Sequence, residues 1–231
     1  MKLSIIIPAY NEAKTLKRVI ETVRAVDPGI ALEKEIIVVN DGSADATREI
    51  IDQMSGITAI HLEKNLGKGA AIKKGFERST GDFVIIQDSD LEYDPHDYGA
   101  LLRPVIEHGA DVVFGTRFRG EYHRVLYFWH YMGNVFLTLL SNMFTNLNLS
   151  DMEVGYKVFS KSVVQTITPK LKSKRFGIEP ELTARVAHGG WAIYEVPIHY
   201  AGRTYAEGKK IGWRDGIKAI FSIIYFNIFD R

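Results

Sequence analysis

Four short apolar runs, each followed by a polar turn and then by a helix-like stretch, constrain the fold of this chain most strongly. They span residues 3–7, 36–39, 84–86 and 111–114. Strands that alternate with helices of about 10 to 15 residues are typical of a largely parallel sheet. We therefore predict an α/β fold in which a mostly parallel twisted sheet carries helices on both faces, within a single domain over residues 1–231.

Acidic residues follow the ends of three of these predicted strands. Glu12 follows the first, Asp41 the second, and Asp88 and Asp90 the third. In open parallel sheets, ligands bind beyond the carboxyl ends of the strands. Side chains two residues apart on an extended chain point the same way, so Asp88 and Asp90 can converge on one hard cation and its phosphates. An isolated Asp-x-Asp pair usually belongs to a turn, and its place at a strand end favours a metal site here.

The composition agrees with one globular domain. The chain has 231 residues, of which 46% are hydrophobic, and this suffices for one continuous core. It contains no cysteine, which excludes disulfides and thiolate metal sites and fits a reducing compartment. The first apolar run covers about five residues and leads into Pro8, unlike a signal peptide. We therefore expect a cytoplasmic protein.

The net charge of +1 hides an asymmetry between the two halves of the chain. Residues 1–115 carry an excess of six acidic residues, whereas residues 116–231 carry an excess of seven basic ones. We expect the first half to bind the metal and the donor, and the second half to face an anionic phosphate or membrane surface. The basic residues are scattered and no nucleic-acid module is recognisable, so no nucleic-acid partner is expected.

The stretch 125–150 contains no Asp, Glu, Lys or Arg. Its polar residues recur every three or four positions and so share one helical face. We predict a helix that lies in the membrane interface, while an ordinary core helix and a transmembrane span stay open as alternatives. The polar residues are His130, Asn134, Thr138, Ser141, Thr145 and Asn148.

A second apolar segment, residues 217–229, closes the chain. At about 14 residues it is too short to span a bilayer. Because it is apolar on most faces, we expect it to pack on the first helix or on lipid.

Four motifs carry a resemblance to a known family. Residues 8–12 read Pro-Ala-Tyr-Asn-Glu, residues 39–43 Val-Asn-Asp-Gly-Ser, residues 65–69 Asn-Leu-Gly-Lys-Gly, and residues 88–93 Asp-Ser-Asp-Leu-Glu-Tyr. In order and spacing they resemble the inverting family-2 glycosyltransferases, in particular the polyprenyl-phosphate sugar synthases that include dolichyl-phosphate mannose synthase. The resemblance implies a Rossmann-like, nucleotide-sugar-binding fold and a divalent cation, Mg²⁺ or Mn²⁺. Residues 65–69 lack the P-loop spacing, so we expect them to form the turn that begins a helix.

The resemblance also assigns site residues. It implies a metal site in which Glu92 departs from the Gln common at that position. It further implies catalytic roles for Asp90, Arg117 and Arg203, and an acceptor-phosphate site of Arg117, Arg203 and Lys210, with Lys209 as the alternative to Lys210. The implied metal ligands are Asp88, Asp90 and Glu92, and the implied donor-binding residues are Pro8, Ala9, Tyr10, Glu12, Asp41, Asp88 and Ser89.

Residues 151–157, Asp-Met-Glu-Val-Gly-Tyr-Lys, resemble the acceptor-side motif of the same family. A phosphate monoester has a second pKa near 6, so polyprenyl phosphate is already a nucleophile at neutral pH and needs no general base. A sugar hydroxyl would need one. The Q-x-x-R-W motif usual in sugar-polymerising members is missing from the sequence, which favours the lipid phosphate.

We therefore predict inverting transfer of a hexose, mannose before glucose, from a GDP- or UDP-sugar to polyprenyl or dolichyl phosphate. The enzyme is expected to be peripheral on the cytoplasmic face of the membrane, as a homodimer or beside a membrane-anchored partner. One alternative is a hydroxyl-directed glycosyltransferase with Asp151 or Glu179 as the base. The other is a non-catalytic subunit that binds a sugar nucleotide or lipid.

Overall fold

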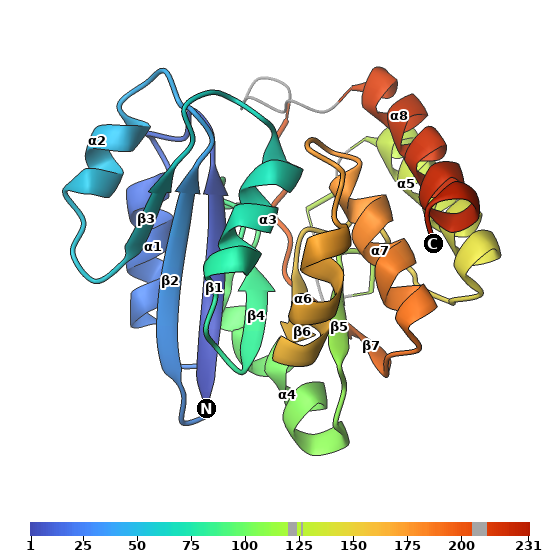
Figure 1. Cartoon of the computed structure of the whole chain (residues 1–231), viewed down its shortest axis with the longest axis horizontal. Helices are drawn as coiled ribbons and strands as arrows, with labels where there is room; N and C mark the ends of the chain where they lie inside the picture. The colour runs from blue at the N-terminus through green and yellow to red at the C-terminus, as the bar shows by residue number, and fades with distance from the viewer. Residues whose placement is uncertain (120–123, 126, 205–211) are drawn as a thin grey trace.

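The structure is a computed structural model that describes residues 1–119, 124–125, 127–204 and 212–231. Its centre is a seven-stranded sheet with the order β3-β2-β1-β4-β6-β5-β7 (Figure 1). All neighbouring pairs are parallel except those of β6, which runs antiparallel to β4 and β5. The strands are β1 (Lys2–Ala9), β2 (Glu33–Asn40), β3 (Thr58–His61), β4 (Phe83–Ile86), β5 (Val112–Thr116), β6 (Lys157–Ser160) and β7 (Ile193–Pro197).

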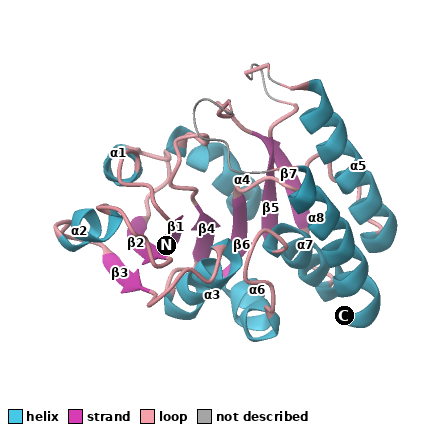
Figure 2. Cartoon of the chain, turned by 90° about the horizontal axis from the view of Figure 1, so that it is seen from above, coloured by secondary structure: helices cyan, strands magenta, loops and turns pink. Residues whose placement is uncertain are grey.

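Helices cover both faces of the sheet. Figure 2 shows α1 and α4 on one face and α3 and α6 on the other. Among the described residues the α-helices are α1 (Leu16–Ala25), α2 (Thr47–Asp52), α3 (Lys68–Arg78), α4 (Tyr98–His108), α5 (Phe128–Thr145), α6 (Lys161–Ile167), α7 (Ile178–Gly189) and α8 (Trp213–Ile224). Short 3₁₀ turns occur at η1 (Pro95–Asp97) and η2 (Thr168–Lys170), and a π turn, η3 (Tyr225–Phe229), continues α8.

The predicted mostly parallel sheet with two helical faces is confirmed. The four predicted strands correspond to β1, β2, β4 and β5, although β5 begins at Val112, one residue later than predicted, and the core strand β4 is almost completely buried. The sequence did not predict β3, β6 and β7. β3 reads Thr-Ala-Ile-His, β6 reads Lys-Val-Phe-Ser and β7 reads Ile-Tyr-Glu-Val-Pro, so polar residues interrupt or bound each strand and none of them forms a distinct apolar run.

Helix α7 packs into the main core of the sheet through Ile178, Leu182 and Val186. Helices α5 and α8 pack against α7, beyond the β5 and β7 edge of the sheet (Figures 1 and 2). Helices α5 and α8 pack together through Leu137, Ala219 and Ile223, with Met152 beneath them. Of the two predicted partners of the closing segment, the first apolar helix or lipid, the structure shows the first apolar helix. Within the described ranges, no helix combines the length and the apolar character needed to cross a bilayer.

Helix α5 turns its small polar residues inward. Thr138 and Ser141 are buried, and Oγ1 of Thr138 accepts a hydrogen bond from the backbone N–H of Met152. The opposite face is apolar and open, with Trp129 81% and Met143 73% exposed. The helix is shorter than predicted, because Asn146 leaves the helical conformation with a φ of 56°. The buried face of α5 is therefore mixed, with Leu137 beside Thr138 and Ser141, whereas a surface helix usually buries only its apolar face.

Candidate active site

The end of β4 delivers the predicted acidic residues to the centre of the carboxyl edge of the sheet. Gln87 anchors this turn, because its buried Oε1 accepts hydrogen bonds from the hydroxyls of Tyr98 and Tyr156. Ser89 donates to the carbonyl of Pro8 at 3.0 Å and so ties the turn to the end of β1. Leu91 then adopts a left-handed φ of 63°. These contacts fix the directions of Asp88 and Asp90.

Asp88 begins a chain of alternating charges that runs into the interior. Lys68, the first residue of α3, places Nζ 2.8 Å from Oδ1 of Asp88 and 3.1 Å from Oε1 of Glu179. The other oxygen of Glu179 contacts Nζ of Lys157, which is fully buried. Burial alone would lower the pKa of Lys68, but Asp88 and Glu179 raise it well above its ordinary value. Lys68 is therefore a permanent cation at the base of the site.

Asp90 and Glu92 share a different cation, Arg203. Nη2 of Arg203 lies 2.7 Å from Oδ2 of Asp90, and Nε lies 3.1 Å from Oε1 of Glu92. Nη1 is also 3.9 Å from Oε1 of Glu12, which follows β1. Burial, with Asp88 and Glu92 nearby, raises the pKa of Asp90 to about 7. This part of the site therefore brings three carboxyl groups together around one guanidinium.

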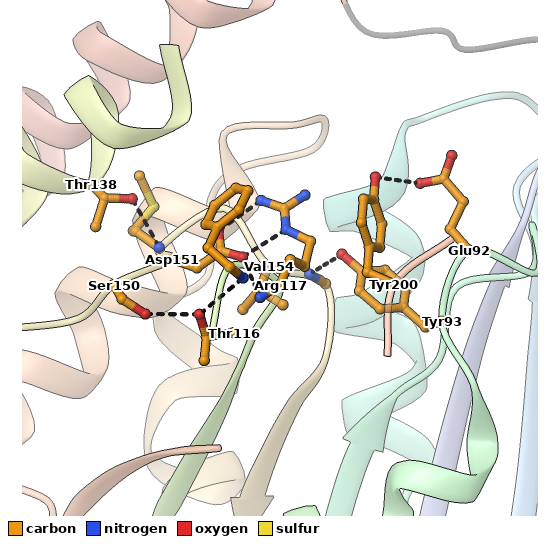
Figure 3. Close-up of polar contacts among 12 residues, drawn as sticks. Glu92, Tyr93, Thr116, Arg117, Thr138, Ser150, Asp151, Val154 and Tyr200 are labelled. Carbon is orange, nitrogen blue, oxygen red and sulfur yellow. Dashed lines mark hydrogen bonds and ion pairs between the residues drawn. The ribbon is translucent and has the colours of Figure 1, made fainter. Parts of the chain in front are cut away.

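Tyr200 joins this acidic cluster to the second predicted arginine (Figure 3). Its hydroxyl donates to Oε2 of Glu92 at 2.9 Å, and the guanidinium of Arg117 lies 5.2 Å from the centre of its ring. Asp151 accepts two hydrogen bonds from the guanidinium of Arg117, of 2.6 Å from Nε and 2.7 Å from Nη2, and a third from its backbone N–H at 3.1 Å. A guanidinium held in this way presents its remaining donors in a fixed direction.

On the predicted nucleoside side, Asp41 has a structural task. Its carboxylate accepts hydrogen bonds from the backbone N–H groups of Leu66 and Gly67, both at 2.7 Å, and from the side chain of Asn65. It therefore holds the turn from which α3 starts, and the prediction that residues 65–69 begin a helix is confirmed. Pro8 and Ala9 end β1, and the Tyr10 side chain that follows is 39% exposed.

The structure thus brings most of the predicted site residues together. Glu12, Asp90 and Glu92 meet at Arg203, and Arg117 follows through Tyr200. Asp88 lies at the same strand end, and Asp41 lies behind the turn that carries Lys68. Lys209 and Lys210 fall outside the described residues.

Sequence reasoning missed the roles of Lys68 and Tyr200. Lys68 stands in the Asn-Leu-Gly-Lys-Gly motif, to which we gave only a helix-start role. Tyr200 stands three residues before Arg203 and was not singled out. Lys157, part of the acceptor-side motif, is buried between Val154 and Glu179 and lies in the interior. Asp151 of the same motif is paired with Arg117.

The chemistry of these acidic residues fits a divalent cation. Mg²⁺ and Mn²⁺ prefer oxygen ligands, and one or two carboxylates plus substrate phosphates often complete a Mg²⁺ site. Among the residues that the structure describes, no group of three or more His, Cys, Asp or Glu side chains is arranged to hold a metal ion by itself. Asp88 and Asp90 each pair with a positive side chain, so positive charge stabilises this cluster of carboxylates.

Comparison with known proteins places the chain in a family. The sequence model described as Glycosyl transferase family 2 matches residues 4–168. The glycosyltransferase AglD of Haloferax volcanii is 27% identical over 219 residues, which cover 87% of this chain. This chain spans only 33% of AglD.

A second relative matches over nearly its whole length. The UDP-N-acetylglucosamine–dolichyl-phosphate N-acetylglucosaminyltransferase of Methanococcus voltae is 25% identical over 241 residues, covering 95% of this chain and 94% of the relative. Among solved structures, glucosyl-3-phosphoglycerate synthase of Mycobacterium tuberculosis, in complex with Mn²⁺, UDP and phosphoglyceric acid, superposes with a TM-score of 0.75. The two chains are 21% identical, and the match covers 98% of this chain and 78% of the other, so this likeness shows the fold.

Proposed function

This chain belongs to glycosyltransferase family 2, and from that premise we propose that it transfers a sugar from a nucleotide-sugar to a polyprenyl or dolichyl phosphate, with inversion, at a membrane surface. The sugar is a hexose or N-acetylhexosamine. Mannose and glucose follow from the motif resemblance, and N-acetylglucosamine follows from the name of the Methanococcus voltae relative.

The observation that carries this proposal is the state of the two candidate bases. Asp151 is held by three hydrogen bonds from Arg117, and Glu179 is held between Lys68 and Lys157. Burial favours the neutral form of Glu179, but the two lysines lower its pKa below the ordinary value. A carboxylate tied in this way is a poor proton acceptor, so a nucleophile that needs no base suits this site better.

Each group then has a role in the transfer. A dianionic phosphate oxygen attacks the anomeric carbon while the bond from that carbon to the nucleoside diphosphate breaks, and the electron pair leaves with the diphosphate. Arg117, and Arg203 once it is free, bind the acceptor phosphate and reduce the repulsion between the two anionic substrates. Asp88, Asp90 and Glu92 would hold the divalent cation, which supplies positive charge to the leaving diphosphate when bound.

The membrane part of the proposal comes from the apolar face of α5 and α8. Phe128 and Trp129 near the start of α5, and Phe221 and Phe229 near the end of the chain, are each more than 60% exposed. Exposed apolar surface of this extent marks a lipid or protein contact. We place this face on the cytoplasmic leaflet. A second copy or a membrane-anchored subunit is the competing occupant.

One observation favours a second function, transfer to a sugar hydroxyl. Oε1 of Glu153 is buried and has no hydrogen-bond partner among the described residues. Burial, with Glu179 nearby, raises the pKa of Glu153 to about 7, which suits a general base at neutral pH. Glu153 lies in the acceptor-side motif, two residues after Asp151.

The test is transfer of radiolabelled sugar from GDP-mannose, UDP-glucose and UDP-N-acetylglucosamine, with Mg²⁺ or Mn²⁺, to polyprenyl phosphate or to soluble sugars. Metal-dependent label in the organic phase, lost in Asp90→Ala, would support the proposal and name the donor. Label in soluble sugars alone, lost in Glu153→Gln, would support the second function. Donor binding without any transfer would favour a non-catalytic subunit.

A further inference from the structure

We infer that Arg203 is the resting counter-cation of the acidic cluster, and that a divalent cation must displace its guanidinium before Arg203 can bind an acceptor. The second half of this inference rests on the proposed function. The first half concerns cation binding alone and can be tested without any transfer reaction.

The contacts of Arg203 show how the guanidinium is occupied. Nη2 lies 2.7 Å from Oδ2 of Asp90, Nε lies 3.1 Å from Oε1 of Glu92, and Nη1 lies 3.9 Å from Oε1 of Glu12. These three carboxylates follow two different strands, β1 and β4. One side chain, 21% exposed, thus offsets part of the negative charge of three carboxylates from two separate turns.

A divalent cation competes for the same atom. Oδ1 of Asp90 already accepts a hydrogen bond from the backbone N–H of Glu92 at 3.2 Å, so Oδ2 is the oxygen directed at external charge. Oδ2 is the atom that Arg203 occupies. A guanidinium and a divalent cation a few ångströms apart repel each other strongly in a partly buried site. The two cations are therefore alternatives at Asp90.

The main chain around Arg203 is anchored independently of its guanidinium. The backbone N–H of Arg203 donates to Oε1 of Glu92 at 2.9 Å, and the N–H of Ala201 donates to the carbonyl of Glu92 at 2.9 Å. Displacement therefore requires only rotation of a long side chain. Tyr200, which contacts both Glu92 and Arg117, keeps this segment beside the second arginine.

An order of binding follows from this arrangement. Before the cation binds, the guanidinium of Arg203 is paired with Asp90 and Glu92. Arg117 is then the only one of the two arginines that can bind an incoming phosphate. After the cation binds, both guanidinium groups are available for one dianionic phosphate, so the cation raises acceptor affinity through Arg203 as well as through its own charge.

The first experiment measures Mn²⁺ binding by isothermal titration calorimetry, with and without UDP or GDP. We expect Arg203→Gln to bind Mn²⁺ about fivefold more tightly than the wild type or better, because the competing cation is gone. Arg203→Lys keeps the charge without the forked contact and should fall between them. Arg103→Gln, an exposed arginine of α4 paired with Glu107, controls for net charge and should leave Mn²⁺ affinity unchanged. Asp90→Asn should abolish this binding.

Equal or weaker Mn²⁺ affinity in Arg203→Gln, in protein with an unaltered circular dichroism spectrum, would overturn the inference, as would no Mn²⁺ binding to either protein. A second arm measures binding of a short isoprenyl phosphate. Mn²⁺ with nucleoside diphosphate should raise its affinity more in the wild type than in Arg203→Gln. If the Mn²⁺ affinities change as expected but the isoprenyl phosphate does not bind, the counter-cation role stands and the lipid-phosphate acceptor is wrong.

Discussion

Gly155 lies so close to Asp88 that a β-carbon on residue 155 would overlap Oδ2 of that carboxylate. The backbone N–H of Gly155 also donates to the hydroxyl of Tyr93 at 2.9 Å. The acceptor-side motif therefore packs directly against the first carboxylate of the Asp-Ser-Asp turn, and the glycine is required by this close approach.

Gly155→Ala should displace Asp88 and lower transfer activity by about 100-fold, since misplacement of a reacting group by about 1 Å costs that much. The overpacking should also destabilise the protein by about 1 to 3 kcal/mol. Gly133→Ala is the matched control, because a β-carbon there meets open space on α5, and it should be neutral or stabilising by up to about 1 kcal/mol. Thermal unfolding measures the stability of both variants, and initial rates measure their activity. Equal effects of the two substitutions would contradict the close packing of Gly155 against Asp88.

Lys68→Met should destabilise the protein by about 3 kcal/mol, because it leaves the carboxylates of Asp88 and Glu179 without their shared cation. Lys74→Met removes an exposed lysine from the same helix, where Nζ pairs with Glu77 at 2.7 Å. This control should change the free energy of unfolding by no more than about 0.5 kcal/mol. Urea denaturation measures both values, and a loss in Lys68→Met no larger than in the control would show that the pairing is not stabilising.

Glu153→Gln should alter the pH dependence of stability. Burial, with Glu179 nearby, raises the pKa of Glu153 in the folded state to about 7, above the value of about 4.3 in an unfolded chain. The folded state therefore binds the proton of Glu153 more tightly than the unfolded chain does, which stabilises the protein. This contribution to the free energy of unfolding is complete below about pH 4, decreases as the pH rises, and is absent above about pH 7. Gln carries no such loss.

The melting temperature of Glu153→Gln relative to wild type should accordingly rise by a few degrees between pH 5 and pH 8 and then stay level. Glu21→Gln, which removes a surface glutamate of α1 paired with Lys17, reports the effect of removing an exposed charge. If the difference in melting temperature between Glu153→Gln and wild type does not change with pH, the carboxyl group of Glu153 does not have the raised pKa expected from its burial.

The apolar face of α5 and α8 should bind anionic vesicles. Trp129→Glu and Phe221→Glu, at side chains 81% and 69% exposed, should each weaken co-sedimentation with phosphatidylglycerol vesicles by about tenfold or more without changing the melting temperature. Ile106→Glu, at an exposed apolar residue of α4, is the control and should bind vesicles as the wild type does. Sedimentation velocity that shows a dimer lost in Trp129→Glu, with no vesicle binding by the wild type, would assign the face to a second copy.

The strands that could be predicted are those whose apolar residues are consecutive. β1, β2, β4 and β5 contain such runs, since a strand covered by helices on both faces is apolar throughout. β7 is half-exposed along most of its length, and β6 has only two consecutive apolar residues, between a lysine and a serine, so neither differs locally from a loop. Their places in the sheet depend on pairing with β5, which no local pattern specifies.

The part of the candidate site that could be predicted is the part that depends on spacing between residues close together in the sequence. Asp88 and Asp90 lie on one strand end because alternate residues point the same way. The partners of these carboxylates could not be predicted from spacing, because Arg203 lies 113 positions from Asp90 and Lys68 lies 20 positions from Asp88. The motif resemblance pointed to Arg203 as an acceptor ligand and did not anticipate its contact with Asp90 and Glu92.

By itself, the sequence determined the α/β class, the edge of the sheet where the carboxylates gather, and the family to which the chain belongs, because periodicity and short motifs are local properties of the chain. Only the tertiary structure decided which cation neutralises each carboxylate, which residues of α5 face inward, and that Gly155 closes against Asp88. Those outcomes depend on contacts between segments far apart in sequence, where packing space and charge pairing select one arrangement among many that the local patterns allow.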